Sequence, residues 1–250
     1  MKQSIIPAII VLGVSQAICL AQYSFSTDFS QSQNFTQGVG TTGWLGAYSG
    51  NNSSSTFESS SGQLTINDTG GHWEYGNTSG HLLYVSIAGD FTMEGLLNSL
   101  STSAYATAGI GAFDPTVTTA NPTATWIVAY YKGFDGEIGS RSAANGSSTD
   151  DSPYNVGQNE TDIYFKMTRV GDAFTQYYSL NGTDFTEIDS ITMDSLPETL
   201  DVGIWEGSYS GNTSTSVWDS FSVTAISVPE PGTIALVGMG LAGLLAFRRK

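Results

Sequence analysis

The residues of this chain most able to do chemistry are its 23 acidic side chains. Retaining hydrolysis of a glycosidic bond needs two or three carboxyl groups at alternate positions of one strand, so that acid and nucleophile face the same cleft. No Glu-x-Asp-x-Glu pattern occurs, and Glu74, Glu137 and Glu206 stand alone on different segments. We therefore expect these glutamates to be solvated surface acids and the protein not to be an enzyme.

Histidine and cysteine offer no stronger site. His72 and His81 are nine positions apart, without the helical spacing of a zinc site, and Cys19 is the only cysteine of the chain. No Gly-x-Ser-x-Gly elbow or phosphate-binding loop is present. We expect both histidines to lie in loops and to hold no metal.

Two aspartates far apart in the sequence suggest a hard oxygen site. Asp28 lies near the start of the body and Asp219 near its end, and the two meet if the first and last strands pair. Backbone carbonyls would then complete a calcium site; the alternative is that both are hydrogen-bonded structural acids. Asp150 and Asp151 fall in the polar segment 143–158, which we expect to be an exposed loop. We expect no other cofactor.

Aromatic residues are the best indication of ligand binding, because sugar rings stack on flat aromatic faces. Trp126 and Tyr130 share one face of the expected strand 125–131, and Trp205 with Tyr209 follows at the end of another strand. These four are the candidate glycan-binding residues. The alternative is that they fill the core of a two-sheet fold.

Positive charge is scarce in the body. The formal net charge is -15, and the chain has only 8 Lys and Arg residues. Half of them lie near the chain ends, and the body keeps Lys132, Arg141, Lys166 and Arg169. Nucleic acids and anionic bilayers bind clustered cations, so we exclude both as partners of the body.

The first 21 residues read as a secretory signal peptide. Lys2 precedes an apolar run over residues 5–14, and Ala21 provides a small residue at the cleavage position. Ile18 stands before Cys19, where a lipobox needs a small residue, so lipoprotein processing is not expected. The mature body, residues 22–227, then contains no thiol and fits a single exported domain.

Residues 228–250 form a tail with three parts in a fixed order. Pro229, Glu230 and Pro231 precede an apolar run over residues 233–247, which ends in a basic cluster of Arg248, Arg249 and Lys250. The prolines lack amide donors and keep the motif extended, whereas the apolar run predicts a short membrane-inserted helix. The basic cluster stays on the cytoplasmic side, so the body faces outwards.

This tail resembles the PEP-CTERM sorting signal of Gram-negative bacteria, whose proteins are often associated with exopolysaccharide. The resemblance implies processing at Pro229-Glu230-Pro231 by an exosortase-type membrane enzyme. It also implies an inner-membrane intermediate and a final location at the cell surface or in the extracellular matrix.

Short runs of alternating polarity, closed by Gly, Asn or Asp, predict an all-β body. In residues 162–170, Ile163, Phe165 and Met167 point one way, and two tight turns link this strand to the next two in a meander. The expected strands cover residues 23–29, 63–67, 82–87, 91–97, 105–113, 125–131, 162–170, 173–180, 185–191, 200–206 and 217–226. We expect two antiparallel sheets packed as a jelly roll or β-sandwich.

The body resembles the concanavalin A-like lectin/glucanase superfamily. The resemblance is carried by residues 164–172 running into 177–182, by Val202-Gly203-Ile204 and by the closing segment 218–223. Strand and turn motifs of this kind imply a fold and no particular activity.

Three functional hypotheses follow. The first is an exported, non-catalytic surface or matrix protein associated with glycan or exopolysaccharide. The second is a dedicated carbohydrate-binding module, and the more distant third is a polysaccharide hydrolase.

Replacing Pro229 and Pro231 with Ala is expected to trap the protein in the inner membrane, because the extended recognition site is lost while the distant body is unaffected. Fractionation followed by mass spectrometry of the protein from its native host measures this. A surface form of the wild type that still ends at Lys250 would contradict processing.

Overall fold

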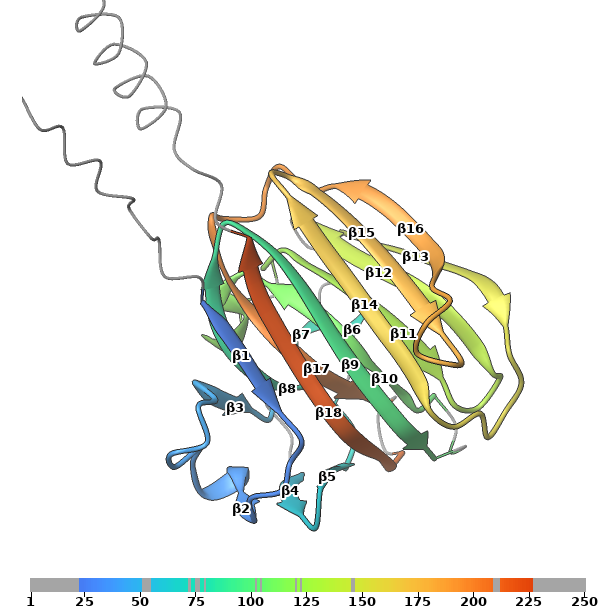
Figure 1. Cartoon of the computed structure of the whole chain (residues 1–250). Helices are drawn as coiled ribbons and strands as arrows, with labels where there is room; N and C mark the ends of the chain where they lie inside the picture. Colours follow the sequence, from blue (N-terminus) through green and yellow to red (C-terminus); the bar gives the residue numbers. More distant parts are fainter. Residues whose placement is uncertain are drawn as a thin grey trace, which may run out of the picture.

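Two antiparallel sheets packed face to face make up the body in the computed structural model (Figure 1). The structure describes residues 23–50, 55–71, 73–74, 77–78, 80–101, 103, 105–119, 121, 123–144, 147–208 and 212–226. The predicted signal peptide (residues 1–21), its boundary with the body and the tail (residues 228–250) lie outside these residues. Among the described residues, no helix is long and apolar enough to cross a membrane.

The larger sheet has nine strands, eight of them on one path with the order β16-β15-β14-β9-β18-β5-β4-β2, and β1 pairs with β18 beside that path. Its strands are β1 (Ser24–Thr27), β2 (Gln33–Asn34), β4 (Thr56–Ser60), β5 (Gln63–Asp68), β9 (Asp90–Leu100), β14 (Ile163–Val170), β15 (Ala173–Ser179), β16 (Thr186–Thr192) and β18 (Ser214–Ile226). The long strand β18 is paired along one side with β9 and along the other with β5 and then β1.

The second sheet has seven strands in the order β13-β12-β11-β10-β17-β8-β3. They are β3 (Gly46–Tyr48), β8 (His81–Ala88), β10 (Thr107–Phe113), β11 (Trp126–Lys132), β12 (Glu137–Ala144), β13 (Ser147–Asn155) and β17 (Thr199–Gly207). A two-stranded ribbon, β6 (Trp73–Glu74) with β7 (Asn77–Thr78), and two 3-10 helices, η1 (Phe35–Gln37) and η2 (Pro115–Thr119), complete the described elements.

All eleven expected strands are present, with ends that differ by up to three residues. The meander β14-β15-β16 lies within one sheet, and β1 pairs with β18 as first and last strands. The prediction of a loop over residues 143–158 was wrong, because Ser147–Asn155 pairs with β12 as strand β13. Its polar sequence hid the strand: an edge strand with a solvent-facing side needs few apolar residues.

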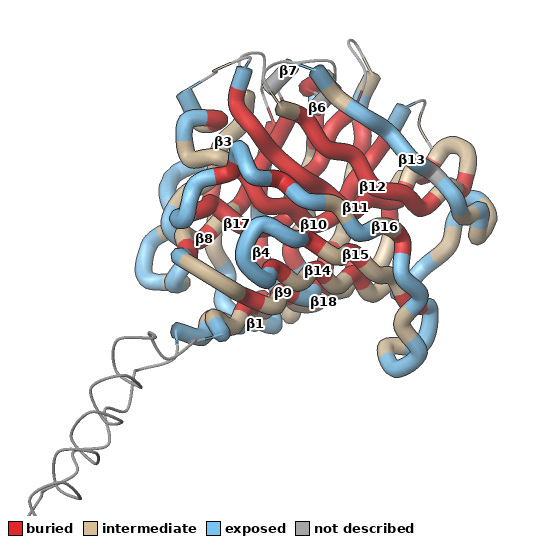
Figure 2. Tube along the Cα trace, turned by 90° about the horizontal axis from the view of Figure 1, so that it is seen from above, coloured by how far each residue is buried: buried red, intermediate tan, exposed pale blue. Residues whose placement is uncertain are grey.

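The main core lies between the two sheets and is continuous in the tube view, where buried segments are red (Figure 2). Ile163, Phe165 and Met167 all point into it, as their alternation predicts. Trp218 and Phe221 of β18 are nearly fully buried in the same core. Alternation therefore sets which side chains of a strand face inwards, and the register shift between Trp218 and Ser220 moves that alternation by one residue within β18.

Three glycines leave room on the outer face of the seven-stranded sheet. Gly109, Gly111 and Gly203 lie at the middle of β10 and β17, in alternation with inward-facing residues. A Cβ at Gly111 would lie 2.7 Å from the ring of Phe113, and one at Gly203 would lie 1.9 Å from the carbonyl oxygen of Leu83. The Phe113 ring uses the space at Gly111, whereas at Gly109 and Gly203 the backbone of the neighbouring strand makes the close approach.

Gly203→Ala is expected to lower the free energy of unfolding by about 3 kcal/mol, because the added methyl group meets a backbone carbonyl that cannot move independently. Urea denaturation of the body measures this loss. Thr192→Ala, on the exposed edge strand β16, is the control and should change stability by no more than roughly 0.5 kcal/mol. Equal stability of the two variants would contradict the close approach of β17 and β8.

Candidate functional site

The outer face of the seven-stranded sheet holds three of the four predicted glycan-binding aromatics. Trp126 and Tyr130 are 0% exposed and Trp205 is 1% exposed. They form a second hydrophobic cluster, which also contains Val117 of η2. The rings of Tyr130 and Trp205 meet edge to face with centroids 6.5 Å apart.

These aromatics are therefore core residues and offer no exposed face to a sugar, which corrects the prediction for Trp126, Tyr130 and Trp205. The indole nitrogen of Trp205 is occupied within the fold, since it donates to the carbonyl of Ala129 at 3.3 Å. Tyr209, the fourth candidate, lies outside the described residues. Alternation alone could not separate the two possibilities, because η2 and its flanking loop cover a sheet face that strand periodicity leaves open.

Two ion-paired groups lie beside the aromatic cluster. Arg141 donates to Asp150 at 2.7 Å, and the Tyr130 hydroxyl donates to the same carboxylate. These contacts outweigh burial and hold the pKa of Asp150 below its ordinary value. Asp150 is thus a paired residue of β13, not the solvated loop tip that we expected, while Glu137 pairs with Lys132 at 3.0 Å.

Asp201 is an acidic residue that the sequence analysis did not single out. It lies on the outer face of β17, is 4% exposed, and has Asp114 close enough to act on its charge. Burial raises its pKa to about 6; a hydrogen bond from Ser86 opposes the shift and the charge of Asp114 adds to it. The signal available in the sequence was that Asp201 shares a face of the expected strand with Trp205. Only glutamates, however, were considered as catalytic acids.

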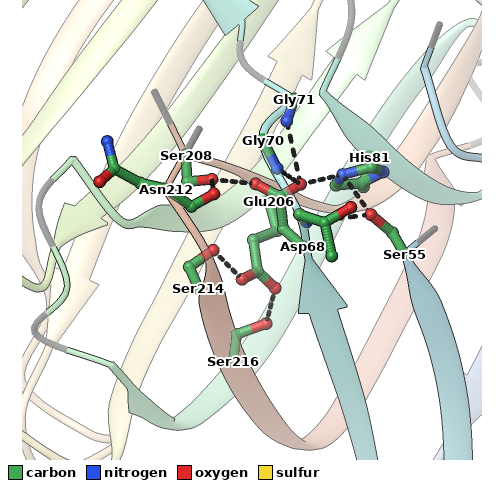
Figure 3. Close-up of polar contacts among 11 residues, drawn as sticks. Ser55, Asp68, Gly70, Gly71, His81, Glu206, Ser208, Asn212, Ser214 and Ser216 are labelled. Carbon is green, nitrogen blue, oxygen red and sulfur yellow. Dashed lines mark hydrogen bonds and ion pairs between the residues drawn. The ribbon is translucent and has the colours of Figure 1, made fainter. Parts of the chain in front are cut away.

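A buried polar cluster closes the main core at one end of the sandwich (Figure 3). Asp68 ends β5, His81 begins β8, Glu206 lies near the end of β17, and Ser214 and Ser216 begin β18. All five are at most 3% exposed. The expectation that His81 is a loop residue and Glu206 a solvated acid was wrong; His72 and the side chain of Glu74 lie outside the described residues.

Asp68 is the centre of this cluster. Its carboxylate accepts hydrogen bonds from the backbone amides of Gly70 and Gly71 at 2.9 and 3.0 Å, and from Ser208 and His81. Burial by itself raises the pKa of a carboxyl, but these donors and His81 outweigh it and lower the pKa of Asp68. Asp68 is therefore an ionised acceptor.

Ser55, His81 and Asp68 are the residue types of a hydrolase catalytic triad, but they are not hydrogen-bonded as in a triad. Ser55 Oγ lies 3.0 Å from His81 Nε2, and the same nitrogen contacts Asp68. Because ionised Asp68 only accepts, Nε2 carries the hydrogen and cannot take a proton from Ser55. Nδ1, which would bind the acid in a triad, has no partner among the described residues. The cluster is structural.

Glu206 is held as a neutral acid in the same cluster. Its two carboxyl oxygens accept from Ser214 and Ser216. Complete burial raises its pKa to about 8; the serine hydrogen bonds oppose this shift, and the negative charge of Asp68 adds to it. An acid so placed destabilises the fold when it ionises.

Asp28 directly follows β1 and Asp219 lies in β18, and these two strands pair as expected. Asp219 accepts from the side-chain amides of Gln63 and Asn98 at 2.9 and 3.2 Å. Asp28 accepts from the backbone amide of Ser30. Among the described residues, no group of three His, Cys, Asp or Glu side chains is arranged to hold a metal ion. Each acid is hydrogen-bonded within the fold, and a calcium site at this pair, completed by backbone carbonyls, stays a prediction.

Glu206→Gln is expected to remove a pH dependence of stability. A raised pKa means that folded Glu206 keeps a proton that the unfolded chain has lost, so wild-type stability falls between pH 4.5 and about 8. The amide cannot ionise. The unfolding free energy of the variant minus that of the wild type should therefore increase by on the order of a few kcal/mol from pH 5 to pH 8. Denaturation midpoints across this range measure the difference.

The control for this measurement is acid stability below pH 4, to which the lowered pKa of Asp68 contributes. That contribution is lost as the pH falls through the Asp68 pKa and should be the same in both proteins. A wild-type midpoint that stays flat from pH 5 to 8 would contradict a buried neutral Glu206.

Comparisons with known proteins agree on the fold. A functionally unknown protein from Saccharomyces cerevisiae matches at a TM-score of 0.58 with 18% identity, covering 81% of this chain and 100% of that one. An endo-beta-1,3-glucanase from Pyrococcus furiosus matches at 0.57 with 12% identity, covering 82% and 94%. Basic winged bean lectin matches at 0.53 with 10% identity, covering 82% and 100%. These similarities confirm the concanavalin A-like sandwich. They do not assign an activity.

Sequence comparisons assign both the tail and the body. A search of curated protein sequences returned no match. The PEP-CTERM protein-sorting motif matches residues 227–250, which confirms the predicted tail with its Pro229-Glu230-Pro231 motif. The model described as protein of unknown function (DUF1349) matches residues 57–226, most of the body. The chain is therefore a member of the DUF1349 family that carries a C-terminal PEP-CTERM sorting motif.

Proposed function

We propose that the protein is a non-catalytic surface or extracellular-matrix protein whose body associates with polysaccharide. The observation that carries the proposal is the sorting motif over residues 227–250, behind a body with the fold of lectins and glucanases. The motif implies export and processing by an exosortase-type membrane enzyme. The exopolysaccharide partner and the final location are the proposed part.

The path of the chain fits a body that projects from a membrane. The backbone amide of Ala225 donates to the carbonyl of Tyr23 at 2.9 Å, so both ends of the body leave from the same end of the sandwich (Figure 1). Strand β18 runs from there to Ser214 at the opposite end, roughly 40 Å away at the rise of an extended strand. While the tail is in the inner membrane, that opposite end points away from the bilayer.

The charge of the body restricts its partners. The whole chain has a formal net charge of -15 although half of its basic residues lie outside the body, so the body is strongly acidic and opposes association with anionic polymers and bilayers. Neutral polysaccharide is therefore the class of extracellular polymer that the surface tolerates best.

A polysaccharide hydrolase is the second candidate, because one observation favours it. Asp201 has a pKa of about 6 and lies near Asp114, and glycosidases use one acid with a raised pKa beside an ionised one. Against it, Asp201 is 4% exposed beneath the aromatic cluster, which leaves little room for a sugar chain. Release of reducing ends that is lost in Asp201→Asn would support the hydrolase.

The full-length protein in mild detergent is expected to co-sediment with the polysaccharide matrix of its host and to release no reducing ends from it. The matrix is prepared from an exosortase-deficient strain. That matrix should lack the mature protein, so its binding sites for the added protein are free. Absence of co-sedimentation would contradict the polysaccharide association, whereas export through the tail would be unaffected.

A further inference from the structure

We propose that a cleft at the end of β1 binds a short segment of a neutral glycan. This inference rests on the proposed polysaccharide association and names the part of the body that would provide it. The cleft has a volume of about 450 Å³, within the range of roughly 300–1,000 Å³ typical of small-molecule sites. It lies between the turn that follows β1, the loop after η1, and β4.

The floor of the cleft is aromatic and rigid. Phe29, Phe35 and Trp44 line it and are 2–4% exposed. Trp44 is parallel to Phe29, with centroids 6.4 Å apart, and contacts the core residue Phe221 at 5.2 Å. The floor is thus continuous with the main core, which keeps the shape of the cleft fixed.

The rim of the cleft is polar and exposed. Asp28 is ionised, because hydrogen bonds from the Ser30 side chain and backbone lower its pKa. The side chains of Gln31 and Thr41 are exposed and take part in no hydrogen bond within the described part of the chain. The rim thus offers the carboxylate of Asp28, the amide of Gln31 and the hydroxyl of Thr41. Sugar hydroxyl groups both donate and accept hydrogen bonds, so they can pair with all three.

The backbone around the cleft is held in a costly conformation. Phe29 has φ of 53°, a left-handed value that bulky residues rarely adopt, and its amide donates to the Thr27 side chain at 3.1 Å. The Ser59 hydroxyl fixes the next part of the turn by donating to the carbonyl of Gln31 at 2.5 Å. Such strain is concentrated at ligand-binding sites, where the surrounding contacts maintain it.

The charge of the cleft selects the ligand class. Asp28 is the only charged residue among those that line it, so phosphate, sulfate and uronic acid groups are repelled. A neutral glycan supplies hydroxyl donors to Asp28 without that repulsion. The cleft begins at the end of β1 opposite to Tyr23, the residue whose carbonyl accepts from the amide of Ala225.

Two variants test the cleft in the full-length protein in mild detergent, with an array of neutral oligosaccharides that includes glucans, xylans, mannans and galactans, followed by calorimetry. Thr41→Trp blocks the mouth and should weaken binding by at least about tenfold. Asp28→Asn keeps an acceptor for the amide of Ser30 but removes the charge, and should weaken binding by about tenfold. Thr192→Trp, the same replacement as at Thr41 but on the opposite edge of the sheet, should bind as the wild type does.

The outcomes separate this inference from the proposed function. Wild-type binding that Thr41→Trp and Asp28→Asn leave unchanged would overturn the cleft as the site while polysaccharide association stands. Co-sedimentation with native matrix without binding to any neutral oligosaccharide would overturn the ligand class. Thermal unfolding checks that each variant is folded, and equal losses in Thr41→Trp and Thr192→Trp would show a general effect of the replacement and overturn the assignment.

Discussion

The pairing of β18 with three other strands is the constraint on which the rest of this structure depends. It joins β9 on one side to β5 and β1 on the other, so the last strand of the body closes the sheet that the first strand begins. Its inward side chains, Trp218 and Phe221 among them, form the middle of the main core. The same strand fixes where the two ends of the body leave the sandwich, because Ala225 bonds to Tyr23 there.

The start of β18 also makes the buried polar cluster tolerable. Ser214 and Ser216 satisfy both oxygens of Glu206, which would otherwise be an unpaired acid within the core. Complete burial and the nearby charge of Asp68 keep Glu206 neutral despite its serine donors, whereas Asp68 remains ionised because His81, the Gly71 amide and Ser208 outweigh its burial. Two acids in one apolar environment thus take opposite protonation states according to their hydrogen-bond partners.

The outer face of the seven-stranded sheet is covered in this chain by its own side chains. Trp126, Tyr130 and Trp205 form a hydrophobic cluster there with Val117 of η2. The lectin and the glucanase share the arrangement of strands with this protein at 10–12% identity, and a shared fold does not assign a function. The exposed polar cleft at the edge of the other sheet is a separate feature of this chain.

Sequence alone determined the features that depend on local patterns. Alternating polarity identified eleven strands, because a half-buried strand must place apolar residues at every second position. The sorting tail was equally readable, since Pro229, Glu230 and Pro231 precede an apolar run and a basic end in direct succession. By contrast, the sequence analysis missed β12, the polar edge strand β13 and the short strands β2, β3, β4, β6 and β7, which are too polar or too short for the pattern to be recognised.

Only the tertiary structure decided what each candidate side chain does. Trp126 and Trp205 had the type and spacing of ligand-binding residues, but their burial depends on a loop that covers them from outside their own strands. Asp68, His81 and Glu206 come from three strands of two sheets, and the cleft from residues 26–59, so neither grouping is visible as a spacing along the chain. Local periodicity specifies which face of a strand is apolar; what lies against that face is set by contacts between distant segments.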